Sequence, residues 1–160
     1  AASDILTYIA ALPAAERVAM KSELDQIELR LADQVEGAPG AVELIQTLHG
    51  QGRRLGILTR NLQAVAVSTL RQMGILECFA LEDVLGREDA APKPDPEGIQ
   101  LLLERWQLTP TQAVMVGDFH FDLEAGRAAG SYTCLIHPQN RWPELADWHA
   151  VDCRSLLASC

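Results

Sequence analysis

The spacing of apolar residues divides the chain into two parts. Between residues 14 and 35, apolar side chains recur every three or four positions, and charged side chains take the opposite face. The members of this apolar stripe are Met20, Leu24, Ile27, Leu31 and Val35. One such stripe is typical of a helix that packs a single face against the rest of the protein. We therefore predict a helical segment over residues 1–36 that ends at Gly37-Ala38-Pro39-Gly40, and an α/β domain over residues 37–160.

Beyond this break, short apolar runs alternate with segments of helical pattern. The predicted strands cover residues 55–58, 81–85, 113–116, 132–136 and 150–151. The predicted helices cover residues 41–49, 62–73, 97–106, 123–129 and a last segment after 154. Continuous apolar strands separated by helices indicate a parallel sheet that is buried on both faces. The fold class is therefore α/β, a three-layer Rossmann-like arrangement, in which ligands bind beyond the carboxyl ends of the strands.

The composition is that of one globular domain. The chain has 160 residues and is 48% hydrophobic, which is enough to bury a core. Its formal net charge of −9 argues against nucleic acid and anionic membrane surfaces as partners. No apolar run approaches the ~20 residues that cross a bilayer, and no signal-peptide pattern is present, so we expect a cytoplasmic protein. The four cysteines show no zinc spacing and are expected to be free thiols.

Two polar groups stand where this fold binds ligands. Thr59, Arg60 and Asn61 follow an apolar strand and precede a helix, where a hydroxyl and free N–H groups form an anion site. Alternatively, Thr59 or Asn61 only caps the helix. Lys93 stands among three prolines that restrict the backbone and hold its ammonium in a limited set of directions. The alternative for Lys93 is an exposed lysine in a stiff loop.

A third group is the segment Gly117-Asp118-Phe119-His120-Phe121-Asp122. Two acids four residues apart, at the end of a buried strand, can converge on one hard cation. Gly117 allows the backbone to approach a ligand closely. The alternative is that Asp118 or Asp122 caps the following helix.

The order of these three groups resembles that of the haloacid dehalogenase superfamily, in the branch that includes phosphoglycolate phosphatases. Thr59 with Asn61, Lys93, and the Gly-Asp-x-x-x-Asp segment at 117–122 resemble the second, third and fourth motifs of that family. The resemblance covers roughly residues 37–157. It implies a haloacid dehalogenase-like α/β core, with residues 1–36 as a remnant of the family's small helical cap.

The resemblance also implies an activity. Family members attack a phosphate monoester with an aspartate and then hydrolyse the aspartyl-phosphate, so we expect a phosphatase that acts on a small phosphorylated metabolite. Thr59 and Lys93 would be catalytic residues that also bind the substrate. Arg60 and Asn61 would bind the substrate too, Arg60 through its N–H or by holding a second anionic group. A solvated helix start is the alternative for Arg60.

For the metal, the resemblance implies Mg²⁺. Asp118 would bind it as a catalytic ligand, and Asp122 would bind it through water or would orient Lys93. His120 faces the leaving group or is a surface histidine, and the sequence leaves this open. The tryptophans are interpreted as packing residues, with a lip near the site at residues 140–143 as the alternative for Trp142.

The sequence departs from the family at one point, because it contains no Asp-x-Asp. In the family, this first motif ends a strand that lies between the strands ending at Thr59 and Gly117. Without it, two buried strand edges are unpaired, and each unpaired buried backbone group costs about 1–3 kcal/mol. Against a total stability of ~5–15 kcal/mol, we expect the nucleophile strand upstream, in a chain that is a fragment or has a misplaced start. The alternatives are a pseudoenzyme and a domain that needs a partner strand.

Two other functions follow from the same pattern. One is a dehalogenase or a phosphonate hydrolase of the same superfamily. The other is a module that binds phosphate and metal without turnover. The sequence leaves the substrate and the oligomeric state open.

Overall fold

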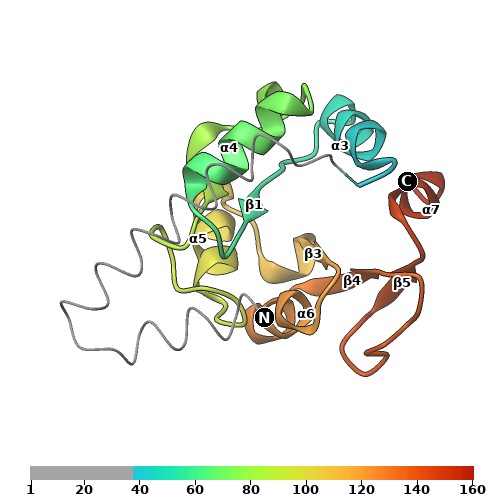
Figure 1. The fold of residues 1–160 in the computed structure, drawn as a ribbon. Helices are drawn as coiled ribbons and strands as arrows, with labels where there is room; N and C mark the ends of the chain where they lie inside the picture. Colours follow the sequence, from blue (N-terminus) through green and yellow to red (C-terminus); the bar gives the residue numbers. More distant parts are fainter. Residues whose placement is uncertain (1–37) are drawn as a thin grey trace, which may run out of the picture.

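The computed structural model describes residues 38–160, and the predicted helical cap segment over residues 1–36 lies outside them. The helices are α3 (Ala41–Gly50), α4 (Gln63–Gln72), α5 (Glu97–Trp106), α6 (His120–Ala129) and α7 (Cys153–Ala158). The strands are β1 (Ile57–Leu58), β2 (Val84–Leu85), β3 (Val114–Gly117), β4 (Tyr132–Ile136) and β5 (Trp148–Ala150). Figure 1 shows their arrangement, coloured along the chain.

Every strand pairing in the described part of the chain is parallel. β1 pairs with β2, with Ile57 opposite Val84. β3, β4 and β5 pair in that order, with Val114 opposite Tyr132 and Cys134 opposite Trp148. A helix connects β1 to β2 and another connects β3 to β4, as parallel pairing requires. The predicted α/β architecture is therefore confirmed.

Several predicted boundaries are confirmed and others are wrong. α5 and β4 have the predicted bounds, whereas residues 81–83 form a 3₁₀ turn and only Val84–Leu85 are a strand. The reason is the buried carboxylate of Asp83, which accepts hydrogen bonds from Arg105 Nε and Trp106 Nε1, both at 2.9 Å. These bonds turn the segment toward α5.

The remaining differences are at element ends. α6 begins at His120, three residues earlier than predicted, because the Asp122 carboxylate accepts the N–H of Phe119 at 3.2 Å and starts the helix there. The first strand is shorter than predicted, and β5 and α7 begin before residues 150 and 154. Such shifts arise because hydrogen bonding rather than the apolar pattern sets where an element starts.

One core cluster joins elements from both parts of the sheet. Leu58 of β1 and Met115 of β3 pack against the same layer of apolar side chains from α5 and α6, namely Ile99, Leu103, Ala125 and Ala129. α6 also lies close against β3 and β4, since a Cβ on Gly126 would come within 2.7 Å of Thr133 Cγ2. β1 and β3 thus rest on one helical layer.

The neighbouring edges of β1 and β3 are not paired within residues 38–160. In that part of the chain, β1 bonds only to β2 and β3 only to β4, and Figure 1 shows the two sheets as separate groups. The prediction that 113–116 is a buried strand is wrong for Val114 and Val116, which are 47% and 41% exposed. Met115 packs on the helical layer, while the two valines point to positions that no described element covers. Within residues 38–160 the strands therefore form two parallel sheets, which are divided between β1 and β3.

Candidate active site

Thr59 lies where β1 ends. Its backbone N–H donates to Leu85 O at 3.0 Å, which continues the pairing with β2 by one residue. Its hydroxyl accepts the N–H of Asn61 at 3.0 Å. α4 begins at Gln63 after Leu62 and has no side-chain cap, so the alternative that Thr59 or Asn61 caps the helix is wrong. The hydroxyl instead belongs to the turn beyond the strand end.

Lys93 reaches into the protein from the proline-rich loop. Its ammonium donates to Leu58 O at 3.0 Å and to Asp122 Oδ1 at 2.6 Å. The side chain is 16% exposed, so the alternative of a solvated lysine is wrong. A small pocket beside the ammonium is lined by both Thr59 and Lys93.

The two acids after β3 have different surroundings. The buried carboxylate of Asp122 holds the Lys93 ammonium on one oxygen and the Phe119 N–H on the other. It lies so close to Gly117 that a Cβ on this glycine would overlap it. Asp118 is exposed, and its carboxylate has no hydrogen bond or ion pair within residues 38–160. The carboxylate of Asp122 is thus bonded to other residues of the chain, whereas the carboxylate of Asp118 is available to a ligand.

The ammonium of Lys93 joins the two sheets at their carboxyl ends. Leu58 O belongs to the end of β1, and Asp122 lies in the first turn of the helix that follows β3. One side chain therefore spans the ends of strands that do not pair with each other. The structure brings Lys93 to Asp122 and to the strand end that carries Thr59.

Within residues 38–160, Asp118 offers Mg²⁺ a single carboxylate, and the other ligands would be water, substrate or residues outside this part of the chain. Mg²⁺ takes one or two carboxylates and keeps several waters, which matches an exposed carboxylate beside a glycine at a strand end. Among residues 38–160, no group of three His, Cys, Asp or Glu side chains could hold a metal ion. A closed zinc site, which needs four side chains, is therefore not formed by this part of the chain.

Arg60 and Arg87 form a second layer of cations behind the site. Arg60 NH1 donates to the backbone oxygen of Lys93, and its guanidinium lies 5.1 Å over the ring of Phe121. Arg87 NH1 donates to Arg60 O at 3.4 Å, and burial lowers the pKa of Arg87. These contacts hold Arg60 against the loop that carries Lys93.

These motifs and their geometry can be compared with known proteins. Residues 3–136 match the haloacid dehalogenase-like hydrolase family. The chain belongs to this family. A phosphoglycolate phosphatase of Nitrosospira multiformis is 32% identical over 76% of the chain and 52% of its own length. A pyrophosphatase of Listeria welshimeri is 31% identical over 66% of the chain and 48% of its own length.

A hydrolase of known structure from Pseudomonas syringae shares the fold of this chain. It superposes with a TM-score of 0.79 over 92% of the chain and 73% of its own length, at 20% identity. The chain spans about half the length of the two relatives above. No helix among residues 38–160 is both long and apolar enough to cross a membrane.

An aromatic group lies beside the two acids of this haloacid dehalogenase-like site, and sequence reasoning offered its tryptophan only as the alternative, a lip at residues 140–143. Trp142, from the loop after β4, contacts the rings of Phe119 and His120 at centroid distances of 5.6 and 5.5 Å. His120 is also within 3.3 Å of Glu124 through Nδ1. The run Phe119-His120-Phe121 between the acids was the visible signal, because three adjacent rings at a polar strand end need apolar neighbours.

Proposed function

We propose that the chain carries the site of a Mg²⁺-dependent phosphatase that acts on a small phosphomonoester through an aspartyl-phosphate. The observation that supports this most is the Lys93 ammonium, held between Leu58 O and Asp122 Oδ1 at the ends of β1 and β3. Family membership supports the same reaction class.

The anionic phosphoryl group would be held by residues after β1 and by Lys93. The Thr59 hydroxyl and the N–H of Arg60 would donate hydrogen bonds to its oxygens, and Asn61, whose N–H donates to Thr59 Oγ1, would position that hydroxyl. The Lys93 ammonium would neutralise their charge. Phosphoryl transfer depends on positioning and charge neutralisation more than on covalent chemistry of the protein, so these groups suit the reaction.

The two acids would have separate tasks. Asp118 would hold Mg²⁺, because its carboxylate has no partner within residues 38–160. Asp122 would fix Lys93 through the 2.6 Å contact and would reach the metal only through water. When bound, Mg²⁺ supplies positive charge beside the phosphoryl oxygens.

The nucleophile would come from a strand inserted between β1 and β3. The sequence contains no Asp-x-Asp, and the two strand edges are unpaired within residues 38–160. A strand in this position would end beside Thr59, Lys93 and Asp118. Its aspartate would attack phosphorus as the bond to the leaving oxygen breaks, and water would then release phosphate from the aspartyl-phosphate.

The test uses the chain extended upstream to include an Asp-x-Asp strand, hereafter the strand-extended chain. Phosphate release is measured from a panel of phosphomonoesters and from inorganic pyrophosphate, with Mg²⁺ and with a chelator. We expect release from at least one phosphomonoester that needs Mg²⁺ and is lost in Asp118→Asn and Lys93→Ala. Release from none of the panel would contradict the proposal, and activity that survives chelation would favour a metal-independent hydrolase of the superfamily.

The absence of Asp-x-Asp in the sequence also supports a second candidate, a module that binds phosphate and metal without turnover. The strand-extended chain distinguishes the two functions. Mg²⁺ and phosphate binding without phosphate release would identify the binding module.

A further inference from the structure

An aromatic pair, the exposed Phe119 and the half-buried Trp142, lies beside the acid that would hold Mg²⁺. Phe119 directly follows Asp118 and is 41% exposed, although it is a large apolar side chain. Its ring meets the ring of Trp142 at 5.6 Å with an interplanar angle of 80°, an edge-to-face contact. An exposed aromatic ring that packs edge-on against a second, half-buried ring offers a surface that a ligand can cover.

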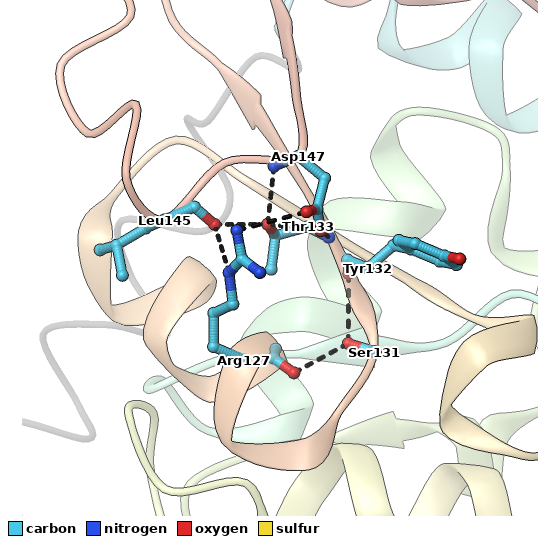
Figure 2. A network of polar contacts seen from close by, with 7 residues as sticks. Arg127, Ser131, Tyr132, Thr133, Leu145 and Asp147 are labelled. Carbon is cyan, nitrogen blue, oxygen red and sulfur yellow. Dashed lines mark hydrogen bonds and ion pairs between the residues drawn. The ribbon is translucent and has the colours of Figure 1, made fainter.

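The loop that carries Trp142 is fixed to the core where it approaches β5. Figure 2 shows this end: Thr133 Oγ1 donates to Leu145 O at 2.5 Å, and the Thr133 N–H donates to the Asp147 carboxylate at 2.8 Å. Arg127 of α6 donates to Leu145 O at 3.1 Å and pairs with Asp147 at 3.2 Å. The loop is therefore tied both to β4 and to α6, the helix that carries the candidate acid Asp122.

The other end of the loop is fixed as well. The N–H of His137 donates to Ala150 O at 3.0 Å, and His149 Nε2 lies 2.7 Å from His137 O. Within the loop, Leu145 and Ala146 both donate to Trp142 O, at 3.0 and 3.1 Å. Trp142 is thus held over Phe119 by a loop bonded at both ends, which is how a binding site keeps an aromatic wall in one position.

We propose that Trp142 and Phe119 together form a subsite for the organic part of the substrate and that they select a phosphomonoester with a flat, apolar group near the phosphate. This inference rests on the proposed function. The rings lie close to the phosphoryl site, because Arg60, which follows Thr59, lies 5.1 Å over the ring of Phe121, and that ring is 5.2 Å from the ring of Phe119. A small aliphatic phosphomonoester would leave them uncovered.

The test measures binding of two non-hydrolysable phosphonates to the 160-residue chain by calorimetry in the presence of Mg²⁺. Benzylphosphonate carries a ring and ethylphosphonate does not, while their anionic groups are alike. We expect benzylphosphonate to bind about tenfold more tightly, the amount that one aromatic contact with its buried area supplies. Trp142→Ala should remove this preference and leave ethylphosphonate binding unchanged, and Trp142→Phe should retain part of it.

Trp148→Ala is the matched control, because Trp148 is exposed, contacts Tyr132 and lies on β5 away from the acids. It should leave the preference unchanged, and thermal unfolding verifies that each variant is folded. If Trp142→Ala does not fold, Trp142→Phe and Phe119→Ala carry the test. Equal binding of both phosphonates, or a preference that survives in the variants, would overturn the aromatic subsite alone. No binding of either phosphonate would overturn the phosphate site of the proposed function, and the subsite with it.

Discussion

Lys93 connects more of the candidate site than any other residue described above. Its ammonium bonds the last carbonyl of β1 and the buried carboxylate of Asp122. A buried charge pair of this kind contributes little net stability when complete, but removing one partner leaves a charge without compensation. The position of the Lys93 ammonium therefore depends on the end of β1 and on Asp122 together.

Lys93→Met should lower the free energy of unfolding by ~2 kcal/mol, because it leaves the Asp122 carboxylate buried without its cation. Urea unfolding measures this change. The double variant Lys93→Met, Asp122→Asn removes both charges and should recover part of the loss, since an asparagine oxygen still accepts the Phe119 N–H. Additive losses in the double variant would show that the two residues do not interact.

Asp118→Asn should weaken Mn²⁺ binding at least about tenfold without changing the unfolding midpoint. The exposed carboxylate has no partner within residues 38–160, so its loss affects a ligand and not the fold. Mn²⁺, a paramagnetic substitute for Mg²⁺, is titrated by electron paramagnetic resonance. Glu104→Gln on the exposed face of α5 is the control, and equal loss of binding in both variants would indicate only a general charge effect.

At the scale of elements, the short helix α7 depends on its first residue and on its packing. Asp152 precedes the helix and accepts the N–H of Ser155 at 2.8 Å. Cys153 and Leu156 of the helix pack with Ala41 and Leu44 of α3. A helix of this length is not stable alone, so the cap and the contact with α3 together maintain it.

The hydrogen bond from Ser155 lowers the pKa of Asp152. Because the pKa of Asp152 is lower in the folded chain than its usual value of 3.8, the ionised carboxylate stabilises the fold at any pH above 3.8. This stabilisation is lost as the pH falls below 3.8 and through the lowered pKa of the folded state. Asp152→Ala should therefore reduce the Tm at neutral pH, and the difference from the natural chain should narrow in acid. Thermal unfolding by circular dichroism measures it, with Glu144→Ala as control. A difference that stays constant with pH would show that the charge is not involved.

Elements and site residues differ in how far the sequence predicts them. α5 and β4 are predictable because their apolar pattern and flanking residues agree. The exposure of Val114 and Val116 is not predictable from the sequence, because it depends on which distant segment covers the strand. Local spacing also does not show whether Thr59 caps a helix or lines a pocket, because both roles place a hydroxyl after a strand. The run Phe119-His120-Phe121 signals only that these rings need apolar neighbours. That Trp142 is one of these neighbours is not predictable, because a long loop brings it to Phe119.

At the scale of the whole molecule, the main feature is the division of the sheet. β1 and β3 pack on the same layer of α5 and α6, yet their neighbouring edges are unpaired within residues 38–160. Unpaired strand edges and exposed valines are a ready template for a further strand. We propose that the strand that brings the nucleophile pairs with these two edges.

The strand-extended chain should have a higher Tm and a sharper unfolding transition than the 160-residue chain. The added strand would pair both free edges and cover Val114 and Val116. Amide hydrogen exchange gives the residue-level measurement, and protection should rise in β1 and β3 but stay the same in β5. Unchanged protection in β1 and β3 would place the added residues elsewhere.

The most direct test of the account is a crystal structure of the chain with Mn²⁺ and tungstate, a heavy-atom substitute for phosphate. The account predicts anomalous density for Mn²⁺ at the Asp118 carboxylate and for tungstate within hydrogen-bond distance of both the Thr59 hydroxyl and the Lys93 ammonium. Tungstate bound away from Lys93, or a metal ion that Asp118 does not contact, would contradict the assignment of these residues to one site.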